Sequence, residues 1–183
     1  MALPERITSF PLVLRAFTPG DIARVVELCG DPAVALTTAA VPHPYPLEAA
    51  TAWIASHRDA REAGVAWTYA ITRAEDDALV GAIDVRTSTE PELALGYWIG
   101  RAYWGRGYAT TAVRAVIAMT FLGLESDVLG ATHLVRNPAS GRVLEKCGLS
   151  LTRRERRPHR GGAPEEMCVW TMTREQWSAL RAA

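Results

Sequence analysis

Two glycines one residue apart, Gly105 and Gly107, stand in the segment Tyr103–Thr110, between a predicted strand and a predicted helix. Glycine adopts positive φ angles and lets another group approach the backbone closely. A turn of this kind at the start of a helix points several unpaired N–H groups and the positive end of the helix dipole outward. Arg106 adds a positive charge between the glycines. The combination predicts a site for a phosphate or pyrophosphate group.

A tight turn whose glycines serve chain geometry alone is the competing interpretation, because short glycine patterns recur by chance. The segment is not a P-loop, since no Gly-Lys-Ser or Gly-Lys-Thr follows it. It also lacks the third glycine and the downstream acidic residue of a dinucleotide-binding βαβ unit. The residues of the segment alone leave the phosphate site and the plain turn as equal alternatives.

Polar side chains elsewhere could also do chemistry. Asp84 interrupts an apolar strand segment, Ala82-Ile83-Asp84-Val85, where a carboxylate is conspicuous and could accept a proton. An outward or edge position explains Asp84 equally well, because alternation does not reveal which face borders a cleft. Asn137 and Ser140 follow a predicted strand and open a predicted helix, where helix capping is the commonest role of these residue types.

The elements that must position these residues follow from the periodicity of the apolar side chains. Strands are expected at Leu12–Phe17, around Trp67–Ile71 and Leu79–Val85, at Glu92–Ile99 and Val128–Leu134, and in a closing hairpin of Leu149–Arg157 with Met167–Met172. Helices are expected from Thr18 to Gly30 and at Leu47–Glu62, Ala109–Leu122 and Ala139–Cys147. This order predicts a mixed α+β domain around one sheet.

Composition limits the kind of protein. The 183 residues are 49% hydrophobic, which predicts one globular domain over residues 1–183. The 20 basic and 20 acidic residues cancel, so we expect neither a nucleic-acid nor a membrane partner. Cys29, Cys147 and Cys168 show no metal-binding spacing and suit reduced thiols. With no signal-peptide pattern at the start, we expect a cytoplasmic protein without a metal.

The one strong charge bias is the basic run Arg153–Arg160. It lacks the interleaved aromatic residues of a nucleic-acid-binding face. A solvated hairpin strand is the favoured interpretation, with attraction of an acidic substrate or contact with a cofactor phosphate as the alternatives.

The glycine turn belongs to a wider resemblance. Trp104-Gly105-Arg106-Gly107-Tyr108-Ala109 resembles the acetyl-CoA pyrophosphate loop of the GNAT superfamily of N-acetyltransferases. With Gly96-Tyr97-Trp98-Ile99 it resembles the branch that contains the ribosomal-protein N-terminal acetyltransferases. Further similar segments, in chain order, are Leu12–Arg15 with Thr18–Asp21, Pro44–Glu48 with Ala52–Ile54, Asn137–Gly148, and Trp170–Trp177 as a closing strand. The likeness runs from Leu12 to Trp177.

The resemblance implies a GNAT-like fold, with one central mixed, mostly antiparallel sheet splayed at the cofactor cleft and flanked by helices. The strands Glu92–Ile99 and Val128–Leu134 would separate, and the pantetheine arm of acetyl-CoA would pair with backbone in the gap. A backbone N–H of the first strand would stabilise the oxyanion during direct attack by the amine. The residues that the resemblance assigns to acetyl-CoA are Trp98, Ile99, Gly105, Arg106, Gly107, Tyr108, Ala109, Thr110, Asn137 and Ser140.

The resemblance also suggests the proton donor to the departing thiolate. Many relatives use a tyrosine four residues before the glycine that ends the second conserved helix, but this chain has Leu144 there. Ser140 is therefore the better candidate, because a hydroxyl can act as an acid only within hydrogen-bonding reach. Helix capping by Ser140 remains the alternative.

The sequence leaves the identity of the general base open. Relatives often carry a glutamate two residues before the Gly-Tyr pair, and this chain has Ala94 there. Glu92, two residues earlier on the same strand face, and Asp84 are the candidates. Water held by a carboxylate would also serve, because an α-amine with a pKa of about 7.7–8.0 is partly neutral at pH 7.

The acceptor is expected to be a primary amine, with a protein or peptide N-terminal α-amine favoured. A polyamine, an amino acid or an aminoglycoside is an alternative, because variable loops read the acceptor. Tyr45 and Trp53 could line the acceptor side, although aromatic residues at such places more often belong to a core. A CoA-binding regulator without turnover is the alternative from another class, favoured by Ala94 and Leu144. A homodimer is possible by resemblance.

Overall fold

One eight-stranded sheet organises the chain, in the spatial order β1-β2-β3-β4-β5-β6-β8-β7. The structure is a computed structural model that describes residues 3–89, 93–159 and 162–182. The strands are β1 (Arg6–Ser9), β2 (Leu12–Arg15), β3 (Ala66–Arg73), β4 (Leu79–Thr87), β5 (Leu93–Ile99), β6 (Val128–Leu134), β7 (Ser150–His159) and β8 (Gly162–Thr173). The helices are α1 (Ile22–Gly30), α2 (Pro32–Thr37), α3 (Leu47–Glu62), α4 (Tyr108–Gly123), α5 (Pro138–Lys146) and α6 (Arg174–Ala182), with short 3₁₀ turns at Pro19–Asp21 and Arg101–Tyr103.

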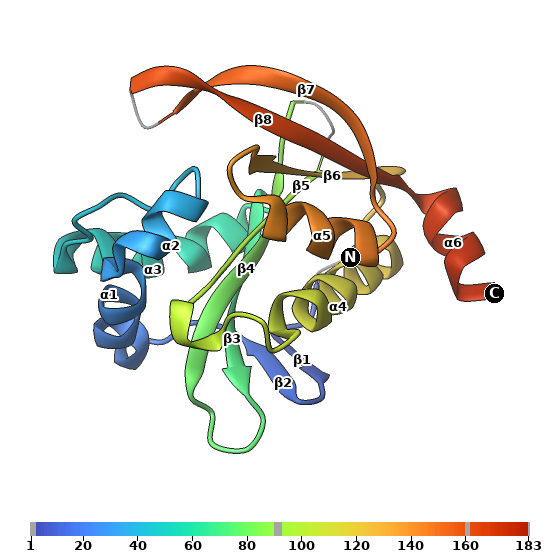
Figure 1. Ribbon diagram of the computed structural model, residues 1–183. Coiled ribbons are helices and arrows are strands. Elements are labelled where there is room, and N and C mark those ends of the chain that lie inside the picture. Colours follow the sequence, from blue (N-terminus) through green and yellow to red (C-terminus); the bar gives the residue numbers. More distant parts are fainter. Residues whose placement is uncertain (1–2, 90–92, 160–161, 183) are drawn as a thin grey trace.

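The helices cover both faces of the sheet, as Figure 1 shows. α1, α2 and α3 lie on one side and enclose a smaller core that includes Val25, Ile54 and Trp98. α4 and α5 lie on the other side and enclose a larger core that includes Val113 and Leu144. This arrangement confirms the expected mixed sheet flanked by helices.

The sheet is interrupted at its centre. Every neighbouring pair of strands is antiparallel except β5 and β6, which run parallel. Their pairing covers only three positions and ends at Leu95 opposite Ala131. Beyond that point β5 continues to Ile99 beside β4 alone, and β6 continues to Leu134 beside β8 alone. The two strands therefore splay apart, as the resemblance implied.

Most elements lie where the sequence predicts them, and the differences have local causes. Helix α2 lies outside the predicted helices, the first of which ends at Gly30. The Asp31 carboxylate accepts a hydrogen bond from Ala33 N at 2.8 Å, and Pro32 occupies the first helical position. Asp-Pro therefore both ends α1 and starts the next helix, because proline needs no N–H partner at that position. Strand β1 was also not expected.

The closing segment differs from the prediction that Trp170–Trp177 is one strand. β8 ends at Thr173, and Arg174 begins α6. Thr173 and Gln176 form a reciprocal cap: the Gln176 N–H donates to Thr173 Oγ1 at 3.1 Å, and the Thr173 N–H donates to Gln176 Oε1 at 2.8 Å. This is a capping box, which fixes a helix start at the end of the strand.

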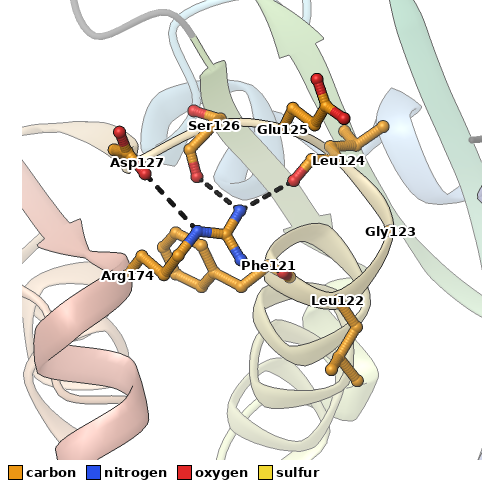
Figure 2. Close-up of a pocket in the computed structure, with 8 residues that line it drawn as sticks. All are labelled: Phe121, Leu122, Gly123, Leu124, Glu125, Ser126, Asp127 and Arg174. Atoms are coloured by element: carbon orange, nitrogen blue, oxygen red, sulfur yellow. Dashed lines mark hydrogen bonds and ion pairs between the residues drawn. The ribbon is translucent and has the colours of Figure 1, made fainter.

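Arg174 then ties α6 to the end of α4, as Figure 2 shows. Its guanidinium donates to the Leu124 and Ser126 carbonyls at 2.8 Å each and to the Phe121 carbonyl. It also lies 5.5 Å from the centre of the Phe121 ring. The hollow around Phe121–Asp127 is therefore a place where a cation caps a helix C-terminus, which its dipole favours.

The basic run forms β7 of the long hairpin that arches across the top of Figure 1. Glu155 lies between Arg153 and Arg157 and contacts both, with a distance of 2.9 Å to Arg153 Nε. The register places Glu166 and Glu165 of β8 opposite Arg156 and Arg157. Acidic neighbours thus offset much of the positive charge, which agrees with a solvated hairpin strand. Arg160 lies outside the described residues.

Candidate active site

A cleft of about 910 Å³ opens where β5 and β6 separate. It is bordered by the start of α4 and by α5 on one side of the sheet and by α3 on the other. Most of the site residues predicted from the sequence line this cleft, namely Asp84, Trp98, Ile99, Gly105, Gly107, Tyr108, Ala109, Thr110, Asn137 and Ser140. The fold therefore brings residues from four separate segments to one cleft. Glu92 lies outside the described residues.

The glycine turn has the backbone that its sequence predicts. Gly105 has φ +74° and Gly107 has φ +79°, and Gly107 is the N-cap of α4. Thr111 is the first α4 residue whose N–H meets a backbone acceptor, the Gly107 carbonyl at 3.0 Å. The N–H groups of Tyr108, Ala109 and Thr110 precede it and have no intrahelical acceptor. They are available to an anion at the positive end of the helix dipole.

The cations near this turn differ from the sequence expectation. The Arg106 guanidinium lies 5.8 Å from the centre of the Tyr103 ring, and Arg106 is not among the residues that line the cleft. Arg142 and Lys146, one turn apart on α5, do line the cleft and are exposed. Sequence reasoning missed this pair. Its i,i+4 spacing places both charges on one helix face and was the signal available.

Trp104 fixes the turn against the strand before it. Its indole N–H donates to the Ile99 carbonyl at 2.7 Å, and 44% of the residue is exposed. This hydrogen bond ties the partly exposed ring to the end of β5. The carbonyl at the end of β5 is therefore already in use on the cleft side of the turn.

Asn137 joins two walls of the cleft. Its side-chain oxygen accepts the Ser140 N–H at 3.2 Å, and its amide nitrogen donates to the Thr37 carbonyl at 2.9 Å. The first contact caps α5, and the second holds the end of α2 beside it. Capping is thus part of what Asn137 does in this structure.

Ser140 makes a contact that the sequence did not reveal. Its hydroxyl oxygen lies 2.8 Å from the Tyr97 hydroxyl, and the Ser140 carbonyl lies 3.3 Å from the same phenol. Burial raises the pKa of Tyr97 to about 12, so the phenol stays protonated at neutral pH. The two hydroxyls form a pair beside the gap between β5 and β6. Tyr97 belongs to the segment Gly96–Ile99, whose resemblance to the family was noted, but its hydrogen-bond partner Ser140 follows 43 residues later in the chain.

Asp84 lies on the α3 side of the sheet. Its carboxylate accepts a hydrogen bond from Arg86 Nη1 at 2.5 Å, and 25% of its side chain is exposed. Burial raises the pKa of Asp84, although the Arg86 charge acts in the opposite direction. A Cβ on Gly96 would lie 2.7 Å from both Asp84 Oδ1 and Arg86 Nη1, so glycine at this position leaves room for the ion pair over β5.

None of the three cysteines is among the described residues that line the cleft. All three are buried free thiols. Burial raises the pKa of Cys29 to about 12 and that of Cys147 to about 11, which keeps both thiols protonated. Within the described ranges, no three His, Cys, Asp or Glu side chains gather as metal ligands would. The described helices include none with the length and apolar character needed to cross a membrane.

Residues 11–150 match the sequence model of the acetyltransferase (GNAT) domain, so the chain belongs to the GNAT acetyltransferase family. It is similar to Probable N-acetyltransferase YjcK of Bacillus subtilis, with 31% identity over 107 residues. That match covers 57% of this chain and 59% of YjcK, so it spans less than two thirds of the relative's length.

Two solved structures illustrate the shared fold. The ribosomal α-N-protein acetyltransferase RimL, in complex with coenzyme A, superposes with a TM-score of 0.80 at 16% identity and covers 92% of this chain and 98% of its own. Spermidine N-acetyltransferase from Vibrio cholerae, in complex with CoA and spermine, has a TM-score of 0.76 at 15% identity, with coverage of 92% and 98%. The first acts on a protein and the second on a small amine, so the fold alone does not select the acceptor.

The variant Asp84→Asn tests the environment of the carboxylate. Because the folded-state pKa of Asp84 is raised, the folded protein holds this proton more tightly than the unfolded chain. Ionised Asp84 therefore lowers the free energy of unfolding at any pH above its folded-state pKa. This loss of stability disappears below the unfolded-state pKa of about 3.9, where the carboxyl is protonated in both states. We expect the wild type to gain stability relative to Asp84→Asn as the pH falls from about 8 to about 4, measured by chemical denaturation.

A control variant, Arg86→Met, should steepen this pH dependence, because it removes the cation that favours the ionised carboxylate. A difference between wild type and Asp84→Asn that does not change with pH would show that the carboxylate is not held in a desolvated place.

Proposed function

We propose that this chain transfers an acetyl group from acetyl-CoA directly to a primary amine, with an N-terminal α-amine as the acceptor class we favour. One observation carries the proposal. The cleft at the split of the sheet joins the unpartnered N–H groups at the start of α4 to the Tyr97–Ser140 pair and to Asp84. Membership of the GNAT acetyltransferase family supports the reaction type.

The residues present fit acetyl-CoA as a co-substrate. The N–H groups of Tyr108, Ala109 and Thr110, with the open turn at Gly105 and Gly107, suit the pyrophosphate. The exposed Arg142 and Lys146 suit the remaining phosphate charge. The edge of β5 that β6 leaves open, next to Trp98 and Ile99, suits the pantetheine amides as an added strand, although the Ile99 carbonyl already accepts the Trp104 indole N–H. Asn137 lies across the gap.

Ser140 is the proton donor to the leaving thiolate, and Tyr97 is the proton donor to Ser140. Attack by the amine forms the C–N bond, and collapse of the tetrahedral intermediate breaks the C–S bond. The Ser140 hydroxyl then protonates the thiolate while the Tyr97 hydroxyl, 2.8 Å away, passes its own proton to Ser140, and Tyr97 regains a proton from solvent in the same turnover. The buried Leu144, at the position where many relatives carry tyrosine, makes this route the one that the chain offers.

Asp84 is the base candidate with a described position. Its raised pKa makes it a stronger base than an exposed aspartate, and it lines the cleft on the α3 side. The proton lost by the attacking amine would go to Asp84 directly or through a water molecule. Glu92 stays a prediction, since its position is not described.

The proposal is tested by free-thiol release from acetyl-CoA with peptides that carry free N-termini, polyamines and aminoglycosides, and by mass spectrometry of the acceptors. We expect amine-dependent thiol release and a mass increase of one acetyl group on the acceptor. Tight acetyl-CoA binding without turnover on any amine would instead favour a CoA-binding regulator. Acetylation restricted to polyamines or aminoglycosides would assign the small-molecule alternative.

The variant Gly107→Ala tests the cofactor turn. A Cβ at Gly107 meets no protein atom within 4 Å, but alanine is strained at φ +79°, so the turn should shift from the conformation that presents its N–H groups. We expect acetyl-CoA affinity to fall about tenfold or more, measured by calorimetry, because binding relies on close approach to the backbone.

Gly64→Ala is the matched control, because Gly64 has φ +68° and open space around it but lies outside the cleft. Both variants should lose about 1–2 kcal/mol of folding stability from backbone strain. Equal acetyl-CoA affinity in both variants would remove the glycine turn from the cofactor site.

The variants Ser140→Ala and Tyr97→Phe test the proton route. Ser140→Ala should lower kcat about 100-fold, and Tyr97→Phe about tenfold, with little change in the KM for acetyl-CoA. Because the two hydroxyls act in series, the double variant should be no slower than Ser140→Ala alone. Multiplicative losses, or a change confined to KM, would show that the pair is structural.

A further inference from the structure

The acceptor side of the cleft has a chemistry of its own, which is separate from the cofactor turn. We call it the acceptor pocket and define it by Tyr45, Trp53, His57, Ala66, Asp84 and Trp98, all of which line the cleft. It lies between α3 and the sheet face that carries Asp84, on the side opposite α4 in Figure 1. Its use by the acceptor rests on the proposed function.

Aromatic rings form one wall of the acceptor pocket. The Trp53 ring centre lies 4.5 Å from that of His57, 5.1 Å from that of Phe17 and 6.5 Å from that of Trp98. Trp53 and His57 sit four residues apart on α3, and both remain partly accessible. Rings that support one another in this way keep their orientation before a ligand arrives. The wall is a preformed apolar surface.

Small residues form the floor. The register places Thr68 opposite Asp84 and Asp84 opposite Gly96, so these side chains share one face of β3, β4 and β5. Ala66 follows on the same face, opposite Arg86. Asp84 and Arg86 also lie on this face, and beside them the small side chains of Ala66 and Thr68 leave space under the aromatic wall that suits an apolar group next to the reacting nitrogen.

The charge of the described residues in the acceptor pocket disfavours a polycation. Asp84 is the only carboxylate among the described residues that line the cleft, and it is already paired with Arg86 at 2.5 Å. Burial lowers the pKa of His57 to about 4, so this ring is neutral at physiological pH. A polyamine or an aminoglycoside would bring several ammonium groups, and each one without a partner carries a desolvation penalty.

The geometry points to an acceptor that carries a single amine beside a bulky apolar side chain, namely the α-amine of an aromatic or branched apolar residue. The nitrogen would approach Asp84 from the open side of the cleft, because Asp84 Oδ1 and Arg86 Nη1 already fill the space over Gly96. The side chain would lie on the floor against Trp53 and Trp98. This assigns a substrate class on grounds of shape and charge.

The test compares phenylalaninamide, leucinamide, glycinamide and spermidine as acceptors under the thiol-release assay. The three amides carry the same α-amine, so they differ in the side chain alone. We expect kcat/KM for phenylalaninamide and leucinamide to exceed that for glycinamide about tenfold or more, because even one methylene group in an apolar pocket changes it at least that much. Spermidine should be the poorest acceptor.

Substitutions of Trp53 then test whether the aromatic wall causes the preference for acceptors with an apolar side chain. Trp53→Ala should bring phenylalaninamide down toward the level of glycinamide and leave the KM for acetyl-CoA unchanged, whereas Trp53→Phe should keep most of the preference. Arg58→Ala is the matched control on the same helix, because the Arg58 side chain is 82% exposed and lies outside the cleft. We expect this variant to keep the kcat/KM values of the wild type for all four acceptors.

The outcomes separate the two proposals. Thiol release that is equal or greater with glycinamide or spermidine overturns the acceptor class and leaves the acetyltransferase proposal standing. Absence of release with every amine, including the wider panel, overturns the acetyltransferase proposal itself. If Trp53→Ala does not fold, the order of the four acceptors with the wild type and Trp53→Phe still decides.

Discussion

The early end of the parallel pairing between β5 and β6 is the constraint on which the rest of the structure depends. Pairing stops at Leu95 and Ala131, so each strand leaves one edge of backbone groups without a strand partner. Such an edge is stable inside a protein only where a helix, a loop or a ligand covers it. The α4 turn and α5 therefore border the gap, and the site is a consequence of how the sheet ends its central pairing.

Much of this architecture could be predicted from the sequence, because periodicity and turn residues act locally. α3 and β6 have the predicted bounds, and α4 differs by one residue at each end. The failures also have local causes: Pro32 begins a helix as readily as it ends one, and Thr173 with Gln176 starts α6 directly after a strand. The periodicity of apolar residues does not reveal a helix cap made by two polar side chains.

The site was less predictable, because its contacts join residues far apart in the chain. The glycine turn could be predicted, since φ and helix dipole are properties of one short segment. The contact of Tyr97 with Ser140 depends on how α5 packs over β5, and the apposition of Asp84 and Gly96 depends on strand register. Neither relation leaves a trace in spacing along the sequence, so single residues could be nominated there but their pairing could not.

The two faces of the sheet have different consequences for how such a protein changes over generations. The larger core beneath α4 and α5 supports the glycine turn, whereas Trp53 and Tyr45 pack against the smaller core of α1 to α3. Substitutions in the smaller core that lie away from the Asn137–Thr37 hydrogen bond and from Tyr103, which packs against both cores, can reshape one wall while the other keeps its geometry, because effects at distant sites are nearly independent. On the proposed function, such substitutions would change the acceptor and keep the donor, which is a physical basis for divergence within one fold.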